Sequence, residues 1–317
     1  MTRFQLLLLL VATSLACQAP RAAQRTVPVD DEPYPIVLVH GISGFREMAG
    51  IPYFVGVAER LRAEGHRVLV AELSPWATVA VRAEQLAAQV DVFRRQTGAA
   101  RVHVVAHSMG GLDARHAITR LGLGPVVASL TTMGTPHRGS PVADAWYAAH
   151  VRPADGLRNV SADVWAAVAR GPDQPSDTSG AVHDLTTHGM AQFNRDVPDH
   201  PQVRYYSFAG RTLTEGASAC DDGVYPNPRA IDLPPPELVA TTNLLIHDVS
   251  DGYVPVWSAR WGTFMGCVPA NHYRLVGHLA GFVELPGVWD HRAFYAAWAE
   301  ELVSGRAARL ARSATTW

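Results

Sequence analysis

The chain has 317 residues, of which 48% are hydrophobic and 18% are charged, and its formal net charge is −2. A chain of this length can form one large α/β domain or two small ones with a sizeable core. Because it lacks the excess of Lys and Arg that is typical of nucleic-acid binding, we expect no nucleic-acid partner.

The first 16 residues have the pattern of an export signal. Arg3 is followed by an apolar run that ends at Ser14-Leu15-Ala16, a small-x-small cleavage site. The run is shorter than the roughly 20 residues that a membrane-spanning helix requires. Cleavage before Cys17 would also suit a lipoprotein, in which this cysteine carries the lipid. We therefore expect an exported protein, either secreted or anchored to the outer membrane through Cys17, with a flexible linker over residues 17–33.

From residue 34 onward, apolar β-rich runs alternate with segments of helical periodicity. The strands are predicted at 36–39, 68–73, 102–106 and 126–132, and the helices at 53–63, 81–96 and 112–121. This alternation predicts an α/β domain over residues 34–305, with a mostly parallel, doubly wound sheet.

The segment Ala106-His-Ser-Met-Gly110 lies between a predicted strand and a predicted helix. It matches the G-x-S-x-G pattern with alanine in place of the first glycine, and strand–turn–helix is the context that makes this pattern specific. The small residues on either side of Ser108 let the strand and the helix approach closely. Ser108 is therefore predicted to be a nucleophile rather than an ordinary turn serine, and His107 is expected to point away from the site.

The alternation of strands and helices breaks between Pro141 and Pro201. Apolar residues at helical spacing, from Leu157 to Val168, lie there between two turn-rich stretches. An insertion at this point follows the carboxyl end of a strand, where α/β sheets bind their ligands. We expect a helical lid over about 141–201 with an apolar face; the alternative is an ordinary core helix.

Three further strands are predicted in the last third of the chain, at 203–209, 244–246 and 273–276. A terminal helix is predicted over 289–302, where apolar residues recur every four positions. Residues 306–317 are expected to form a tail.

A serine hydroxyl becomes a good nucleophile when a histidine takes its proton, and a carboxylate holds that histidine in the right tautomer. In this architecture the acid and then the histidine follow the nucleophile in the chain, on loops after late strands. Asp251 follows the predicted strand 244–246, and its Asp-Gly turn can aim the side chain at the edge of the sheet. It is preferred over Asp248 in the same loop and over Asp222.

The predicted base is His278, because it follows the last predicted strand. The rivals are His272, which precedes that strand, and His291, which begins the terminal helix.

A tetrahedral intermediate also needs hydrogen-bond donors for its oxyanion. The N–H of Met109, at the start of a helix, is one candidate donor. The N–H of Ile42, after the His40-Gly41 turn, is the other. The alternative is that His40-Gly41 is only a tight turn and that Ile42 has no role as a donor.

Cys220 and Cys267 are the two cysteines that remain once Cys17 is removed or lipidated. An even pair in an oxidising compartment favours a disulfide, so we expect a bridge between them. The alternative is two unpaired cysteines too far apart to bridge. No cluster has the His or His/Asp spacing of a metal site, and no cofactor is expected.

Several segments, taken together, resemble one known family. They are Pro35-Ile-Val-Leu-Val-His-Gly41, Val81-Arg-Ala-Glu-Gln-Leu86, 106–111, Gly134-Thr-Pro-His-Arg-Gly-Ser140, Asp251-Gly252 and His278-Leu279. Over roughly Tyr34 to Leu285 the chain is similar to the secreted bacterial triacylglycerol lipases of the α/β-hydrolase fold, and in particular to their calcium-binding Gram-negative class. The resemblance implies a triad of Ser108, Asp251 and His278, with Ile42 and Met109 as the oxyanion donors.

The chain departs from this family at two places. The resembling lipases have a calcium-ligating aspartate two residues after the catalytic histidine, and this chain has Ala280 two residues after His278, which argues against a structural calcium ion. Their first disulfide cysteine precedes the strand that corresponds to 203–209, whereas Cys220 follows it. Lipases of this class often need a dedicated folding chaperone, so the resemblance adds such a partner.

Together these features predict a serine carboxylic-ester hydrolase, a lipase that cleaves acylglycerol esters at a lipid–water interface through an acyl-enzyme. One alternative keeps the same residues but changes the substrate to short-chain esters or a polyester, or transfers the acyl group to another alcohol. The other alternative is a non-catalytic surface lipoprotein of the same fold.

Overall fold

The computed structural model of the protein describes residues 33–48, 50–150, 176–212, 217–228, 232, 235–278 and 289–314. The predicted export signal, Cys17, the segment 157–168 and Ala280 lie outside these residues. In the described part of the chain, no helix is both long and apolar enough to cross a lipid bilayer.

Six strands form one sheet at the centre of the protein, in the order β4-β1-β5-β6-β7-β8. Every neighbouring pair in this sheet is parallel. The strands are β1 (Ile36–Val39), β4 (Val68–Val70), β5 (Val102–His107), β6 (Val127–Met133), β7 (Arg204–Gly210) and β8 (Thr263–Val268). A separate antiparallel pair is made by β2 (Glu47–Met48) and β3 (Ile51–Pro52).

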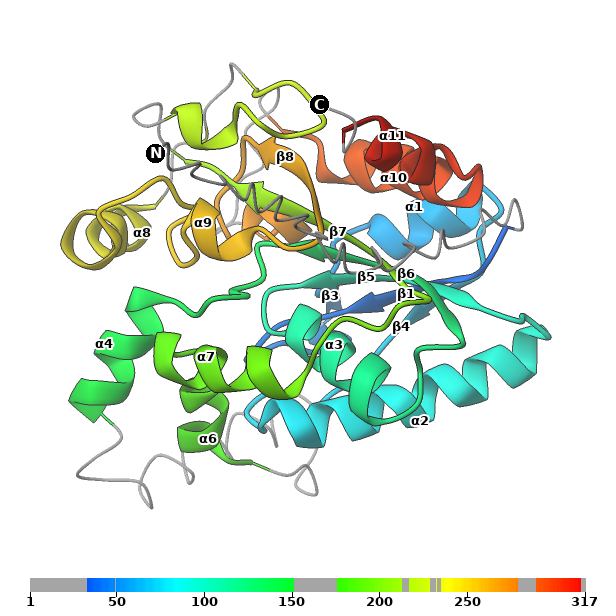
Figure 1. The fold of residues 1–317 in the computed structure, drawn as a ribbon, viewed down its shortest axis with the longest axis horizontal. Coiled ribbons are helices and arrows are strands. Elements are labelled where there is room, and N and C mark those ends of the chain that lie inside the picture. The colour runs from blue at the N-terminus through cyan, green and yellow to red at the C-terminus, as the bar shows by residue number, and fades with distance from the viewer. Residues whose placement is uncertain are drawn as a thin grey trace, which may run out of the picture.

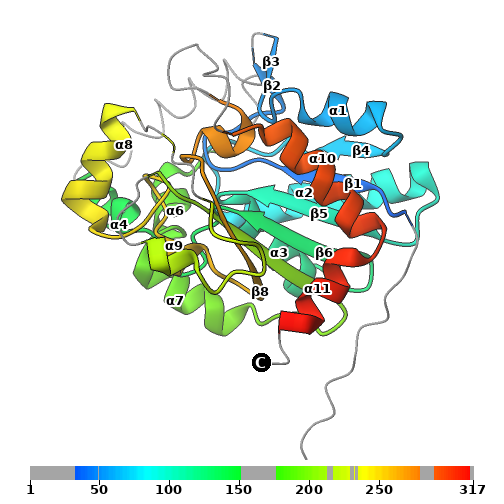
Figure 2. The same cartoon turned by 90° about the horizontal axis from the view of Figure 1, so that it is seen from above.

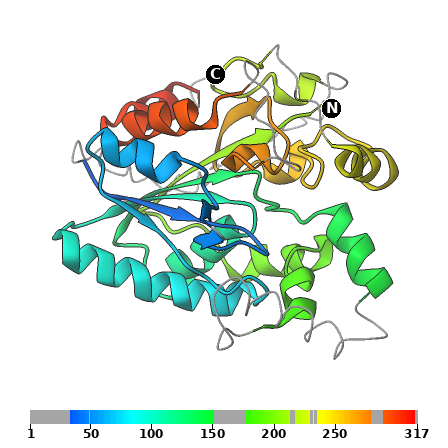
Figure 3. The same cartoon turned by 180° about the vertical axis from the view of Figure 1, so that it is seen from behind.

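Helices cover both faces of the sheet (Figures 1 and 3). One face packs on α1 (Val57–Ala63), α10 (His291–Val303) and α11 (Arg306–Ala314), and the other on α2 (Val79–Thr97) and α3 (Gly110–Arg120). Because successive side chains of a strand point to opposite faces, alternate residues of β1 belong to two different cores. This arrangement confirms the predicted parallel, doubly wound sheet.

Residues 306–314, which belong to the stretch predicted to be a tail, form the helix α11 instead. Helix α11 packs against α10, and its residues Ala307 and Ala308 are buried. The domain therefore continues past residue 305.

The segment between β6 and β7 is a helical insertion, as predicted. Its described helices are α4 (Pro141–His150), α6 (Thr178–His183) and α7 (Thr187–Asp196). Figures 1 and 2 show α4 and α6 at one end of the sheet, together with α8 (Pro236–Thr241). Buried apolar residues of the insertion, Leu185 and Met190, pack on Met109 and Leu112 at the start of α3.

Two of the predicted late strands are wrong. Residues 244–246 belong to η2, a π-helix over Thr242–Ile246, and in the predicted strand 273–276 residues 274–276 form the 3₁₀ helix η3 (Arg274–Val276). A run of three apolar residues does not distinguish a strand from a helical turn. Leu244 is 72% exposed, which a buried central strand would not allow. The last strand among the described residues is β8, which the sequence pattern did not reveal.

Two short helices flank the strand at the edge of the sheet. The 3₁₀ helix η1 (Ala217–Cys220) follows β7, and α9 (Val256–Ala259) precedes β8. A disulfide joins Cys220 of η1 to Cys267 of β8, with 5.6 Å between the Cα atoms. This confirms the predicted pairing.

Replacing both cysteines with serine should lower the free energy of unfolding. The bridge spans 47 residues of chain, and the loop-closure entropy it removes from the unfolded state is worth about 4 kcal/mol. Urea denaturation of Cys220→Ser/Cys267→Ser beside the wild type measures the difference. An unchanged midpoint and slope would show that the bridge contributes nothing.

Candidate active site

Ser108 occupies a strained turn between β5 and α3. Its φ of 55° lies in the left-handed region, which residues other than glycine seldom adopt. Hydrogen bonds on both sides hold this conformation: the Ser108 N–H donates to the carbonyl of Met133, and its carbonyl accepts from Thr135 Oγ1 at 2.7 Å. A strained backbone that its surroundings fix in this way is typical of functional sites.

Two glycines, Gly41 and Gly110, allow the turn that follows β1 to lie against the turn that carries Ser108. A Cβ at Gly110 would stand 2.7 Å from the carbonyl oxygens of Val39 and His40. A Cβ at Gly41 would stand 2.7 Å from Ser108 Cβ. No side chain fits at either position without moving backbone, so both glycines are needed for the two turns to approach.

Ser108, His272 and Asp251 form one chain of hydrogen bonds. Ser108 Oγ lies 3.0 Å from His272 Nε2, and His272 Nδ1 lies 2.7 Å from Asp251 Oδ2. The Asp251 carboxylate is fully buried. Its other oxygen, Oδ1, accepts the N–H groups of Tyr253 and Val254 at 3.0 and 2.7 Å. The carboxylate is therefore held in place while it orients the imidazole.

The prediction that His278 completes this chain is wrong. The rule that the histidine follows the last strand holds, but that strand is β8, which ends at Val268, and the histidine that follows it is His272. The His278 ring instead packs against the rings of Tyr53 and Phe45, with centroids 5.5 and 6.0 Å away. Burial lowers the pKa of His278 from its usual value.

His107 faces the site, contrary to the expectation that it points away. Its ring centroid lies 4.6 Å from that of His272. Its Nδ1 is hydrogen-bonded to Tyr53 Oη at 2.8 Å, and the same hydroxyl accepts the Gly41 N–H at 3.2 Å. Burial lowers the pKa of His107 well below its usual value, which disfavours a positive charge on this ring beside His272. Tyr53 thus connects the turn at Ser108 to the turn at Gly41.

The two predicted oxyanion donors are near Ser108 and free to donate. Met109 immediately follows Ser108 and caps the start of α3, and Ile42 lines the same cavity as Ser108. Within the described residues, neither backbone N–H donates to a protein acceptor. Helix starts leave such N–H groups unpaired, and they suit a developing negative charge.

A buried arginine fixes the turn that precedes Ile42. The Arg82 guanidinium donates to the carbonyls of His40 and Gly41, at 2.7 and 3.2 Å, and to that of Ser74 at 2.6 Å. It also forms an ion pair with Asp113 at 2.8 Å, with both side chains fully buried. Burial raises the pKa of Asp113 to about 7 against the opposing pull of Arg82.

The cavity beside Ser108 has a volume of about 680 Å³ and largely apolar walls. The insertion supplies Val142, Trp146, Val182 and Leu185 to these walls. A long apolar group bound next to the serine would therefore lie against the insertion.

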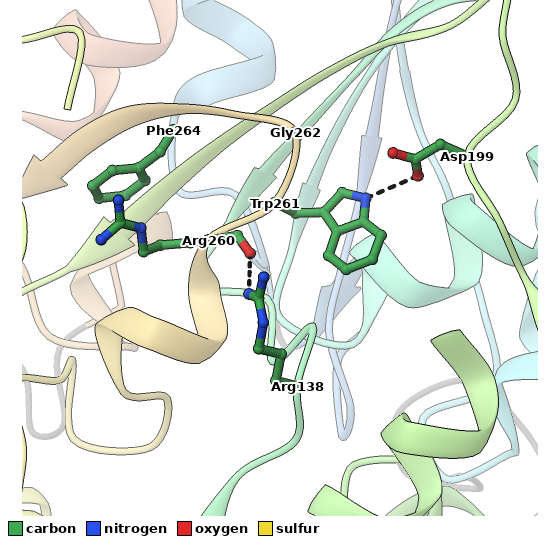
Figure 4. Close-up of a pocket in the computed structure, with 6 residues that line it drawn as sticks. All are labelled: Arg138, Asp199, Arg260, Trp261, Gly262 and Phe264. Carbon is green, nitrogen blue, oxygen red and sulfur yellow. Dashed lines mark hydrogen bonds between the residues drawn. The ribbon is translucent and has the colours of Figure 1, made fainter. Parts of the chain in front are cut away.

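A second hollow, of about 340 Å³, does not include Ser108 or its partners (Figure 4). The Arg138 guanidinium donates to the carbonyl of Arg260, and the Trp261 indole N–H donates to Asp199. The Arg260 guanidinium lies over the Phe264 ring and pairs with Asp222. These polar groups already satisfy one another, so the hollow presents little for a ligand to bind.

Comparisons with known proteins show the family to which the chain belongs. A family profile described as the α/β hydrolase fold matches residues 34–171. Over 280 residues the chain is 32% identical to a triacylglycerol lipase of Vibrio cholerae, covering 80% of this chain and 81% of that protein. The chain belongs to the bacterial triacylglycerol lipase family. It is a hydrolase with the α/β-hydrolase fold.

Further matches include one relative over about half of the chain and one solved structure with the same fold. A triacylglycerol lipase of Pseudarthrobacter phenanthrenivorans is 36% identical, with 52% of this chain and 54% of that protein covered. The solved structure of the metagenomic carboxyl esterase MGS0156 superposes with a TM-score of 0.61 at 19% identity, covering 93% of this chain and 82% of that one.

Replacing Arg82 with methionine should lower the free energy of unfolding by about 3–5 kcal/mol, because the buried Asp113 carboxyl group loses its partner and must take up a proton on folding. Replacing Asp113 with asparagine in the same background should recover part of the loss, since an amide is neutral without taking up a proton. Urea denaturation of the two variants and the wild type measures both effects. Equal stability of Arg82→Met and the wild type would contradict this account of the turn.

Proposed function

We propose that the protein is a serine lipase that hydrolyses acylglycerol esters, with Ser108 as nucleophile, His272 as base and Asp251 as the acid that orients it. The observation that carries this proposal is the hydrogen-bonded chain from Ser108 to Asp251 at the wall of an apolar cavity. The nucleophile, acid and histidine occur in the chain order usual for this fold.

In the first half of the reaction, His272 Nε2 takes the Ser108 proton as Oγ attacks the ester carbonyl carbon. The N–H groups of Ile42 and Met109 donate hydrogen bonds to the carbonyl oxygen, on which a negative charge develops. Losing one such donor typically raises the barrier by about 3–4 kcal/mol. The protonated His272, stabilised by Asp251, then gives its proton to the leaving alcohol, and the acyl group remains on Ser108.

In the second half, His272 takes a proton from water, and the hydroxide formed attacks the acyl carbon. The same two N–H groups donate hydrogen bonds to the second oxyanion. His272 returns the proton to Ser108 Oγ as the bond to the acyl group breaks, and a free carboxylic acid leaves.

The apolar side chains around Ser108 support a long acyl chain as the substrate group. Val142, Trp146 and Leu185 would bury the methylene groups of such a chain, each worth about 0.8 kcal/mol. Leu244 and Leu245 are exposed on η2, which packs on α4 of the insertion. An apolar surface next to the helix that lines the cavity suits contact with a lipid–water interface.

The disulfide and the apolar leader sequence support export of the protein. Disulfides form and persist in oxidising compartments, such as the periplasm and the extracellular space. We therefore propose that the protein acts outside the cytoplasm.

Activity on p-nitrophenyl esters from acetate to palmitate should rise with chain length. A marked preference for acetate would replace the lipase proposal with a short-chain esterase.

Variants of the two histidines separate the proposed base from its neighbour. Ser108→Ala and His272→Ala should each lower kcat by about 10⁴-fold or more, because members of a triad act as a unit. His278→Ala, the matched control, should keep most of its activity, since His278 packs on Tyr53 without bonding Ser108. The rate of hydrolysis of the same p-nitrophenyl esters measures kcat for each variant. Inactive His278→Ala with active His272→Ala would reverse the assignment.

A further inference from the structure

The loop that carries His272 is held by one buried carboxylate, that of Asp232. This side chain is fully buried. Its Oδ2 accepts the backbone N–H of Asn271 at 2.7 Å and the Asn271 side-chain amide at 2.6 Å. Its Oδ1 accepts from the Arg274 guanidinium, with which it forms an ion pair. Asp232 therefore binds both Asn271, the residue before His272, and Arg274, which lies two residues after it.

Further hydrogen bonds tighten the loop between those two points. Asn271 Oδ1 accepts the N–H groups of Tyr273 and Arg274 at 3.0 and 3.1 Å, and so caps the start of η3. The Arg274 carbonyl accepts the indole N–H of Trp289 at 3.1 Å, which ties the loop to the segment before α10. His272 itself donates its backbone N–H to the Asp251 carbonyl. The imidazole thus projects from a backbone fixed on both sides.

The family comparison gives Arg274 a particular meaning. The lipases that the sequence resembles have a calcium-ligating aspartate two residues after the catalytic histidine. Once His272 is taken as that histidine, the corresponding residue is Arg274 and not Ala280. The chain therefore has a cationic side chain where those lipases have an anionic ligand.

The residues of this loop do not fit a calcium ion. Calcium takes six to eight oxygen ligands, several of them carboxylate oxygens. Here the buried carboxylate of Asp232 already accepts from three donors, and the Arg274 guanidinium supplies the positive charge that balances it. Among the described residues no group of three His, Cys, Asp or Glu side chains could hold a metal.

We propose that the Asp232–Arg274 ion pair, here called the histidine-loop ion pair, positions His272 without the help of a bound calcium ion. The protein then needs no divalent cation for activity. Arg274 and Asp232 are positioning residues, since neither contacts Ser108. The inference rests on the proposed function, in which His272 is the base.

Two properties follow for the intact enzyme and its variants. Wild-type kcat and Tm should be the same in EDTA as in calcium. Arg274→Gln should lower kcat by about 10- to 100-fold with KM little changed, because a misplaced base slows the chemical step more than binding. Arg274→Lys keeps a cation within reach of Asp232 and should recover most of the activity. Arg95→Gln, which removes an exposed ion pair with Asp91, is the matched control and should match the wild type.

The decisive experiment measures kcat, KM and Tm for these four proteins in EDTA and in calcium, with His272→Ala alongside. Inactivation of the wild type by EDTA that calcium reverses, or wild-type kcat in Arg274→Gln, would overturn the role of the ion pair. Circular dichroism shows whether Arg274→Gln is folded. If it is not, two other results test the role of the ion pair. Arg274→Lys must keep most of the wild-type activity, and EDTA must leave the wild type active. An active His272→Ala would overturn the proposed function itself, so the two failures are distinguishable.

Discussion

The hydrogen bond between Ser108 Oγ and His272 Nε2 is the interaction on which the rest of the site depends. The two residues are 164 positions apart in the chain, and their side-chain atoms must meet at 3.0 Å. The turn after β5 fixes one partner through its left-handed backbone, and the loop after β8 fixes the other. The parallel sheet brings these two loops together because the carboxyl ends of its strands lie at one edge.

Three buried carboxylates, each with its own partner, hold three parts of the site. Asp251 orients the His272 ring, Asp232 binds the Asn271 N–H before it and the Arg274 guanidinium after it, and Asp113 holds the arginine under the turn before Ile42. A buried charge without a partner is costly, so each pairing favours one arrangement of its loop over the alternatives. The precision of the site therefore comes from electrostatics that the apolar core alone would not supply.

The parts that the sequence predicts well are local. The strand, turn and helix around Ser108 are contiguous, and their small residues and apolar runs indicate the geometry directly. The base was missed because the rule for locating it depends on the last strand. Strand β8 contains Gly266 and has only a weak strand pattern in its sequence, whereas the sequence of residues 273–276 resembles that of a strand. The ion pair of Asp232 with Arg274 joins residues 42 positions apart, and no local pattern signals such a contact.

The most direct test of the central claim is covalent labelling with a p-nitrophenyl alkylphosphonate, followed by peptide mass spectrometry. An activated Ser108 displaces p-nitrophenolate and retains the phosphonyl group, so we predict one adduct per chain, on the peptide that contains Ser108. Labelling should be lost in His272→Ala and kept in His278→Ala. An adduct on another residue, or equal labelling of Ser108 in His272→Ala and the wild type, would contradict the account.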